Sequence, residues 1–106
     1  MAAIDLFRKE KDPREFAAGT TIFKAEEPGD VMYVVLEGEV DIHRKDQVLE
    51  TVKVGGLFGE MALVDNMPRS AAAMTRTACK LAVVDQERFL SLIQSTPAFA
   101  IQIMTV

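Results

Sequence analysis

Short β-rich runs separated by turn signals fill most of the sequence, from Arg14 to Asp85, and this pattern constrains the fold more than any other feature. The two clearest runs are Val31–Glu37 and Glu39–Arg44, which are separated by Gly38. In the second run apolar and polar residues alternate, as in a strand with one buried face. Many short strands at this spacing, with helices mostly at the two ends, predict a mainly β fold. We expect a small antiparallel barrel or jelly roll of the double-stranded β-helix type.

Further strands and their turns follow from the same reasoning. Val31–Glu37 is apolar at both odd and even positions, which predicts that both faces of this strand are covered. Pro28-Gly29 predicts a type II turn with Gly29 at the position of positive φ. In Val48–Val54 the valines are expected on one face, which Glu50 interrupts. The remaining predicted strands are Thr20–Phe23, Ser70–Thr75 and Cys79–Val84.

Helices are predicted near both ends of the chain and once within it. Asp85 is a good N-cap for a helix over Gln86–Gln94, and Pro97 suits the first turn of a last helix over Ala98–Met104. The whole chain, 1–106, is therefore predicted to be one domain. Its parts are an N-terminal helical segment over 1–13 (Ile4–Lys11, ended by Asp12-Pro13), a β-barrel over 14–85 that contains a short helix over Glu60–Val64, and C-terminal helices over 86–106.

The composition argues against several functions. The formal net charge is −4 and no block of Lys or Arg stands out, so we expect no nucleic-acid binding by this chain. The apolar runs are far too short to span a bilayer, and the N-terminus lacks the basic and apolar regions of a signal peptide. We therefore expect no membrane association and a cytoplasmic location. A single cysteine, Cys79, excludes an intrachain disulfide.

A glycine-bearing turn that opens a short helix points to anion binding. Gly59 and Glu60 lie where a predicted strand meets a helix, and free backbone N–H groups at such a helix start attract a phosphate. Arg69 adds a planar charged fork and Ser70 a hydroxyl. Glu60 would repel a phosphate, but it can accept a hydrogen bond from a sugar hydroxyl beside it. From the spacing alone, a structural ion pair between Glu60 and Arg69, with glycines that serve only turns, explains the pattern equally well.

The phosphate-binding cassette of the cyclic nucleotide-binding domain family closely resembles two segments of this sequence, Phe58-Gly59-Glu60-Met61-Ala62-Leu63 and Pro68-Arg69-Ser70-Ala71. The family includes the catabolite activator protein, the regulatory subunits of cyclic-AMP-dependent protein kinase and cyclic-nucleotide-gated channels. The resemblance implies that Glu60 binds the ribose 2′-hydroxyl and that Arg69 holds the exocyclic oxygens of a cyclic phosphate. The other ligand-binding residues that it implies are Phe58, Gly59, Met61 and Ala62, of which the last three offer backbone contacts, and Ser70 and Ala71, which close the site.

The resemblance also implies a function. Serine at position 70 leans toward cAMP, since threonine at this place is associated with cyclic GMP in the family. We expect a non-catalytic sensor or regulatory module that binds a cyclic nucleotide, favours cAMP over cGMP and needs no cofactor. Ligand binding would reposition the C-terminal helices. A protein partner or a homodimer is left open.

Several alternatives compete with this interpretation. One is an interaction module that keeps the barrel but no longer binds a ligand, and another is the truncated sensor part of a transcription regulator or channel. A metal-dependent enzyme on a similar barrel is disfavoured, because His43 is the only histidine. His43 is expected to face solvent from a strand, and Cys79 is expected to be a core residue rather than a nucleophile.

Overall fold

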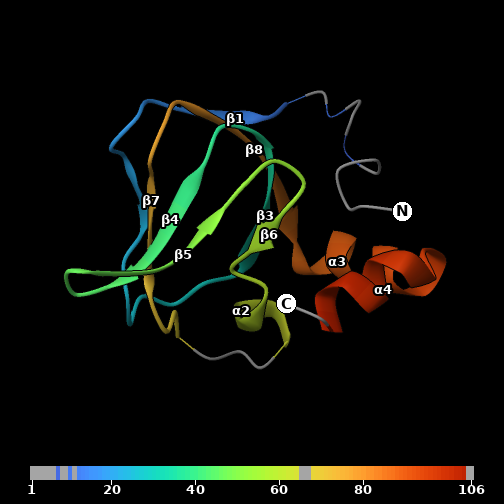
Figure 1. The fold of residues 1–106 in the computed structure, drawn as a ribbon. Coiled ribbons are helices and arrows are strands. Elements are labelled where there is room, and N and C mark those ends of the chain that lie inside the picture. The colour runs from blue at the N-terminus through green and yellow to red at the C-terminus, as the bar shows by residue number, and fades with distance from the viewer. Residues whose placement is uncertain (1–6, 8–9, 11, 65–67, 105–106) are drawn as a thin grey trace.

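Two antiparallel sheets of four strands each, stacked face to face, form the body of the computed structural model (Figure 1). The structure describes residues 7, 10, 12–64 and 68–104. Most of the predicted N-terminal helix lies outside the described residues, as do residues 65–67 of the predicted loop and the last two residues of the chain. The arrangement confirms the predicted mainly β jelly-roll fold with C-terminal helices.

The strands of each sheet come from distant parts of the sequence. The first sheet has the order β1-β8-β3-β6 and the second the order β2-β7-β4-β5. The strands of the first sheet are β1 (Arg14–Phe16), β8 (Cys79–Asp85), β3 (Val31–Glu37) and β6 (Leu57–Phe58). Those of the second are β2 (Thr21–Phe23), β7 (Ala72–Thr75), β4 (Val40–Arg44) and β5 (Gln47–Val52). Apart from the β4–β5 hairpin, neighbouring strands are distant in the sequence, and this pairing brings the two halves of the predicted cassette close to the β2–β3 segment.

Strand β3 is buried on both faces, as the sequence predicted. Met32 and Val34 belong to a cluster on the helix side of the first sheet, where they pack with Leu63, Phe89 and Phe99. We call this the helix-side cluster. The alternate residues of β3, with Tyr33 and Val35 among them, belong to a second cluster between the two sheets. One strand thus joins the barrel interior to the packing of the helices.

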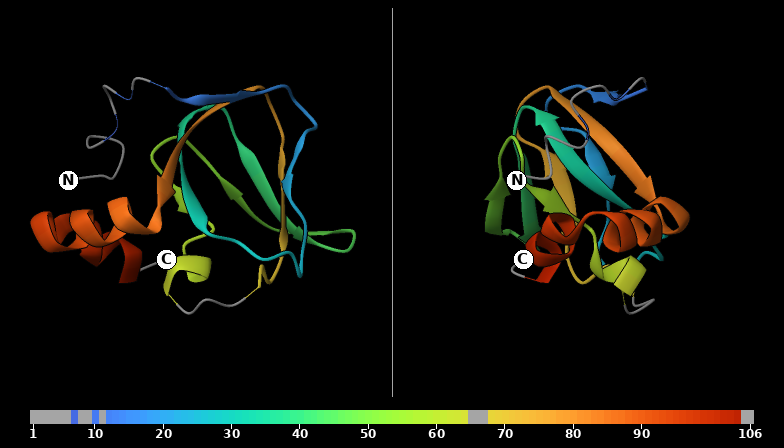
Figure 2. Two further views of the ribbon diagram at one scale, coloured as in Figure 1. Left: turned by 180° about the vertical axis from the view of Figure 1, so that it is seen from behind. Right: turned by 90° about the vertical axis from the view of Figure 1, so that its right-hand side faces the viewer.

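Three helices are described, and they cover one side of the sandwich (Figure 2). They are α2 (Met61–Val64), α3 (Gln86–Ser95) and α4 (Pro97–Met104). The predicted cap of α3 is confirmed, because the carboxylate of Asp85 accepts a hydrogen bond of 2.8 Å from the Arg88 N–H. Phe89 of α3 and Phe99 of α4 meet edge to face with centroids 6.2 Å apart. The two C-terminal helices consequently share the helix-side cluster with α2.

The position of one turn was predicted wrongly. Gly29 does not have a positive φ; the turn lies earlier, where the Glu27 N–H donates to the Lys24 carbonyl at 3.3 Å and Glu26 has φ 73°. A type II turn needs a positive φ at its third residue, and here Glu26 takes that role in place of a glycine. Gly29 serves a different purpose, since a Cβ at this position would overlap the side chain of Arg69.

The prediction that the valines of β5 share one face of the strand was also wrong. Ile42 of β4 pairs with Glu50, but the next residue of β4, His43, pairs with Val48, so Leu49 is an extra residue in β5. This β-bulge reverses the alternation. Val48 is consequently 52% exposed, whereas Val52 is buried. Because directly paired residues share a face of the sheet, Glu50 lies on the same inner face as Ile42.

Candidate functional site

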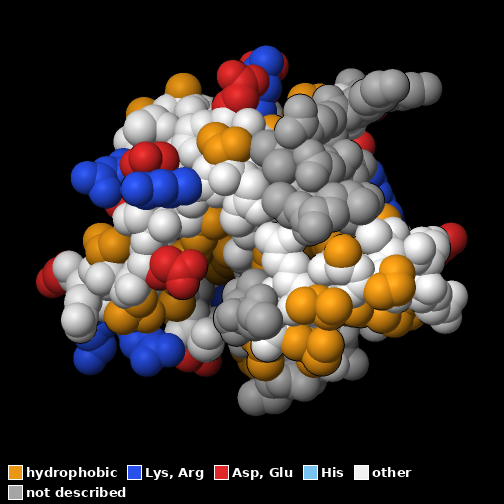
Figure 3. All heavy atoms as spheres, turned by 45° about the vertical axis from the view of Figure 1, so that its right-hand side comes forward, with side chains coloured by type: hydrophobic (Ala, Val, Ile, Leu, Met, Phe, Trp, Pro, Cys, Tyr) orange, Lys and Arg blue, Asp and Glu red, His pale blue; other side chains and the backbone are white. Residues whose placement is uncertain are grey.

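A pocket of about 160 Å³ opens between the second sheet and the segment that carries α2. Figure 3 shows it as a hollow with hydrophobic side chains along its walls and a Lys or Arg side chain at its base. All eight residues that the sequence indicated as ligand contacts line this pocket: Phe58, Gly59, Glu60, Met61, Ala62, Arg69, Ser70 and Ala71. The fold therefore joins the two segments of the predicted cassette into one cavity.

Five further residues line the same pocket and were not predicted as site residues: Phe23, Ile42, Glu50, Leu57 and Pro68. From the sequence, Phe23 is expected only to pack, and it does pack, against Tyr33 and Phe58. For Ile42 and Glu50 the only available signal was strand alternation, which indicates a face of the sheet but not the pocket on that face. The adjacent Pro68 was visible in the sequence as part of the cassette.

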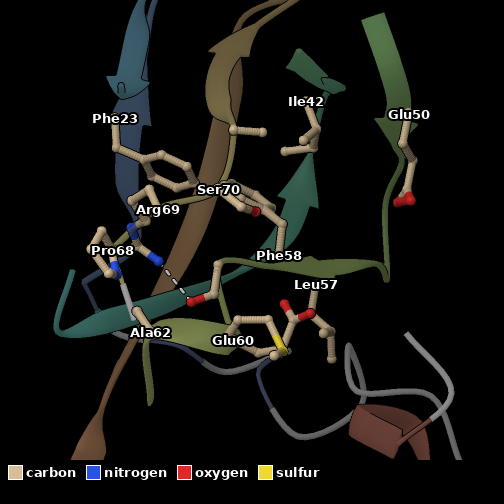
Figure 4. Close-up of a pocket in the computed structure, with 13 residues that line it drawn as sticks. Phe23, Ile42, Glu50, Leu57, Phe58, Glu60, Ala62, Pro68, Arg69 and Ser70 are labelled. Atoms are coloured by element: carbon tan, nitrogen blue, oxygen red, sulfur yellow. Dashed lines mark hydrogen bonds between the residues drawn. The ribbon is translucent and has the colours of Figure 1, made fainter. Parts of the chain in front are cut away.

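The guanidinium of Arg69 is held at one end of the pocket (Figure 4). Its Nη1 donates to the Gly59 carbonyl and its Nη2 to the Val31 carbonyl, both at 2.7 Å. The Phe23 ring lies against it, with Cζ 4.1 Å from the ring centroid, which is a cation–π geometry. Gly29 also packs directly on it, because a Cβ at this position would overlap Cζ and Nε of Arg69. The absence of a side chain at Gly29 is what leaves room for the cation.

One nitrogen of this buried cation has no hydrogen-bond partner among the described residues. Arg69 is only 6% exposed, and its Nε is buried without a hydrogen-bond acceptor among the described residues. Buried donors in native proteins are nearly always paired, so an unpaired one points to an acceptor supplied from outside the chain. Burial lowers the pKa of Arg69, but an arginine stays protonated at neutral pH. An anion in the pocket would satisfy both the charge and the unpaired N–H.

The main chain at Arg69 and Ser70 is fixed from two sides. The Arg69 N–H donates to the Glu27 carbonyl at 2.8 Å, and the Arg69 carbonyl accepts from the Glu26 N–H at 2.7 Å. The Ser70 carbonyl accepts from Nε and Nη2 of Arg44 at 3.2 and 3.0 Å. The turn before β3 and the end of β4 therefore hold this half of the cassette in place. Sequence reasoning did not identify either support.

Glu60 stands at the start of α2 and is 8% exposed. Its carbonyl accepts from the N–H groups of Leu63 and Val64 at 3.0 and 3.1 Å, which closes the single turn of the helix. Among the ion pairs of the described residues none joins Glu60 to Arg69, so the interpretation of the two as a structural ion pair has no support in this structure. Both charges are available to a ligand.

The electrostatic environment of Glu60 is unfavourable to its charge. Burial raises the pKa of Glu60 above its ordinary value of 4.5, and the nearby charge of Glu50 raises it further. Its own backbone N–H and the positive charge of Arg69 act in the opposite direction with smaller effect. A carboxyl group buried in such a place is typical of a binding residue, because a hydrogen-bond donor of the ligand would stabilise its charged form.

We expect Glu60→Gln to be more stable than the wild type at neutral pH. The raised pKa means that the folded state binds more protons than the unfolded state between the two pKa values. The stability contributed by Glu60 is therefore complete below about pH 4.5 and is lost as the pH rises through the pKa of the folded state. Urea denaturation at pH 7 and at pH 4 measures the difference in the free energy of unfolding between Glu60→Gln and the wild type, and this difference should be smaller at pH 4.

Glu39→Gln is the matched control, since the Glu39 carboxylate is partly exposed and outside the pocket. It should not reproduce the pH-dependent gain. A Glu60→Gln variant that is less stable than the wild type at pH 7, with an unchanged pH dependence, would contradict the expected role of burial.

The remaining reactive side chains do not form a catalytic group. His43 was predicted to face solvent, but its Nε2 is buried without a partner among the described residues, and its Nδ1 lies 3.3 Å from the Lys45 carbonyl. Cys79 is buried and packs in the cluster between the sheets, as predicted. Within the described ranges no group of three or more His, Cys, Asp or Glu side chains is arranged to hold a metal ion. In the same part of the chain no helix is long and apolar enough to cross a membrane.

The sequence profile described as "Cyclic nucleotide-binding domain" matches residues 13–96. Among curated proteins, a CRP-like cAMP-activated global transcriptional regulator of Mycobacterium tuberculosis is 30% identical over 110 aligned residues. The alignment covers 99% of this chain and 49% of that protein. The chain thus spans about half the length of the curated relatives it matches.

Solved structures give the same result. The catabolite activator protein of Thermus thermophilus superimposes with a TM-score of 0.80 at 31% identity, over 96% of this chain and 50% of that protein. A structure from work on a cyclic-GMP-dependent signalling pathway that regulates bacterial phytopathogenesis superimposes with a TM-score of 0.81 at 28% identity, over 99% of this chain and 89% of the other. The similarity therefore includes the barrel, the cassette and the helices that follow.

Proposed function

Because this chain belongs to the cyclic nucleotide-binding domain family, we propose that it binds a purine 3′,5′-cyclic mononucleotide, with cAMP favoured over cGMP, and carries out no chemistry on it. The observation that carries the proposal is the buried Arg69 cation. It keeps an unpaired Nε–H in a pocket that also contains the buried carboxylate of Glu60. A cyclic phosphate next to a ribose hydroxyl supplies the acceptor and the donor that these two groups lack.

The roles of the site residues follow from this assignment. Arg69 binds the exocyclic phosphate oxygens through a charge-assisted hydrogen bond, and Glu60 accepts from the ribose 2′-hydroxyl. Gly59, Met61 and Ala62 offer backbone contacts at the start of α2, where the first N–H groups of a helix have no partner within the helix. The sugar and base lie against Phe58, while Ser70 and Ala71 close the phosphate end.

The preference for cAMP rests on Ser70 in the cassette. The relatives themselves differ, since one curated relative is described as cAMP-activated and one similar structure belongs to a cyclic-GMP-dependent pathway. Both nucleotides therefore have to be tested side by side.

Calorimetry with cAMP and cGMP tests the binding directly. At a ligand concentration one hundred times its Kd, binding to the folded state alone should raise the free energy of unfolding by about 2.7 kcal/mol. Heat of binding and a rise in Tm with cAMP, and weaker effects with cGMP, are the expected results. Absence of both effects with either nucleotide would instead favour a barrel that serves only as an interaction module.

The regulatory output would pass through the helix-side cluster. Leu63 of α2, directly beside the site, packs in this cluster with Phe89 of α3 and Phe99 of α4. A ligand that shifts α2 would therefore change the packing of both C-terminal helices and the populations of their alternative conformations. We expect saturating cAMP to change amide hydrogen exchange in residues 86–104. Unchanged exchange there, with slower exchange in residues 58–64, would show a ligand site without this output.

Partners beyond the nucleotide remain proposals from the sequence. A net charge of −4 disfavours DNA binding by this region, whereas a longer regulator or channel that carries the region as its sensor part is consistent with the length of the relatives. A protein partner or a homodimer, and a cytoplasmic location, are proposed on the same basis.

A further inference from the structure

Glu50 lines the pocket at the side opposite Arg69 (Figure 4). Ile42 and Phe58 lie between the two, and the Glu60 side chain lies below them in this view. Glu50 faces this pocket because it pairs directly with the inward-facing Ile42, in the regular part of the β4–β5 ladder where Val40 pairs with Val52. The bulge at Leu49 comes directly before Glu50 in β5 and turns Val48, not Glu50, to the other face.

The carboxylate of Glu50 has no structural task in the described part of the chain. None of the ion pairs and side-chain hydrogen bonds there involves it, and its residue is exposed at the edge strand of the second sheet. Glu50 and Glu60 line the same pocket, and the charge of Glu50 contributes to the raised pKa of Glu60. A second carboxylate in a pocket for an anionic ligand is unfavourable unless it meets a donor on the ligand.

The orientation of the proposed ligand identifies that donor. With the phosphate at Arg69 and the ribose at Glu60, the base extends away from Arg69, toward Ile42 and Glu50. The only exocyclic hydrogen-bond donor of adenine is its 6-amino group, which lies on the ring remote from the ribose. An ionised carboxylate only accepts hydrogen bonds, so at the purine 6-position it matches an amino group and repels an oxo group. Guanine and hypoxanthine offer a carboxylate donors at other positions, N1–H in both and the 2-amino group in guanine.

We propose that Glu50 determines base specificity: it accepts a hydrogen bond from the adenine 6-amino group and disfavours a 6-oxo purine. This proposal rests on the proposed function. The inference assigns cAMP selectivity to β5 as well as to the cassette. It also explains why an acidic side chain stands in a pocket that must attract an anion.

Three ligands that differ at the purine 6-position test the proposal: cAMP, purine riboside 3′,5′-cyclic monophosphate, which has hydrogen there, and 3′,5′-cyclic IMP, which has an oxo group. A hydrogen bond to a charged group contributes about 1.5–3 kcal/mol, and exposure of Glu50 reduces it. We therefore expect the wild type to bind cAMP about tenfold more tightly than the purine riboside ligand, and cyclic IMP more weakly still.

The variants Glu50→Ala and Glu50→Gln separate base recognition from general charge effects. Removal of the negative charge changes the affinity for all three anionic ligands together, so the affinity ratios are the readout. In Glu50→Ala the preference for cAMP over the purine riboside ligand should fall to about one. In Glu50→Gln the amide can donate to an oxo group, so the discrimination against cyclic IMP should decrease. Glu39→Gln, outside the pocket, should leave all ratios unchanged.

The outcomes distinguish this inference from the function on which it rests. Unchanged affinity ratios in Glu50→Ala, with cAMP still bound, would overturn the role of Glu50 and leave the proposed function intact. Tighter wild-type binding of cyclic IMP or cGMP than of cAMP would overturn the 6-amino assignment. If the wild type bound none of these ligands, the proposed function itself would fail.

Discussion

Replacement of Arg69 by lysine is expected to weaken cyclic nucleotide binding by about 1.5–3 kcal/mol, or roughly ten- to a hundredfold, in calorimetry with cAMP. Lysine keeps the positive charge, but it lacks the planar fork with fixed donors that the arginine presents. Two of the five guanidinium N–H donors bind the carbonyls of Gly59 and Val31, and the unpaired Nε–H is among those that remain for phosphate. The three donors of an ammonium group share one nitrogen, so they cannot take the place of donors on three separate nitrogens of the fork.

Lysine is a better test here than alanine. Alanine at position 69 would leave the carbonyl groups of Gly59 and Val31 without their donors. Such losses reduce stability by about 1–3 kcal/mol for each buried group. Arg76→Lys is the matched control, because the Arg76 side chain is 59% exposed and lies outside the pocket. Wild-type affinity in Arg69→Lys, with the control also unchanged, would sink the assignment of Arg69 to phosphate.

Substitution of Gly29 by alanine is expected to weaken cAMP binding to a similar degree without a large change in stability. The new Cβ would overlap Cζ and Nε of Arg69, so the guanidinium must move away from its position against Phe23. Gly29 does not have a positive φ, and an alanine at this position is therefore not strained in its backbone. Overpacking of this kind typically costs about 1–3 kcal/mol, and a movable side chain reduces that cost.

Gly19→Ala provides the opposite control. Gly19 has φ 76°, and a Cβ added there would have no neighbouring atom within 4 Å, so alanine strains the backbone and touches nothing. We expect it to lower the free energy of unfolding by about 1–2 kcal/mol and to leave cAMP affinity unchanged. Denaturation and calorimetry on both variants should give opposite patterns. If Gly29→Ala bound cAMP as tightly as the wild type, the position of Arg69 would not be the basis of affinity.

Much of the fold could be predicted because the relevant signals are local. The residues of Val31–Leu36 are apolar whichever face of the strand they point to, and the strand that they form is buried on both sides. Asp85 is followed by an amphipathic run, and the cap and the helix both form there. Prediction failed where an irregularity in the pairing of two strands interrupts alternation. The extra residue in β5 turns Val48 outward, and this bulge is specified by pairing with β4 rather than by the residues of β5 alone.

The class of fold and the residues of the cassette follow from the sequence, because strand alternation, helix caps and the cassette motif with Glu60 and Arg69 are readable within short stretches. How these residues are oriented depends on the tertiary structure. Gly29 and Arg69 are far apart in the chain, and they meet because the β2–β3 segment folds over the cassette. Glu50 lines the same pocket because it pairs with Ile42 on the inner face of the second sheet. Contacts of this kind depend on how two sheets stack, and no local pattern of residues encodes that stacking.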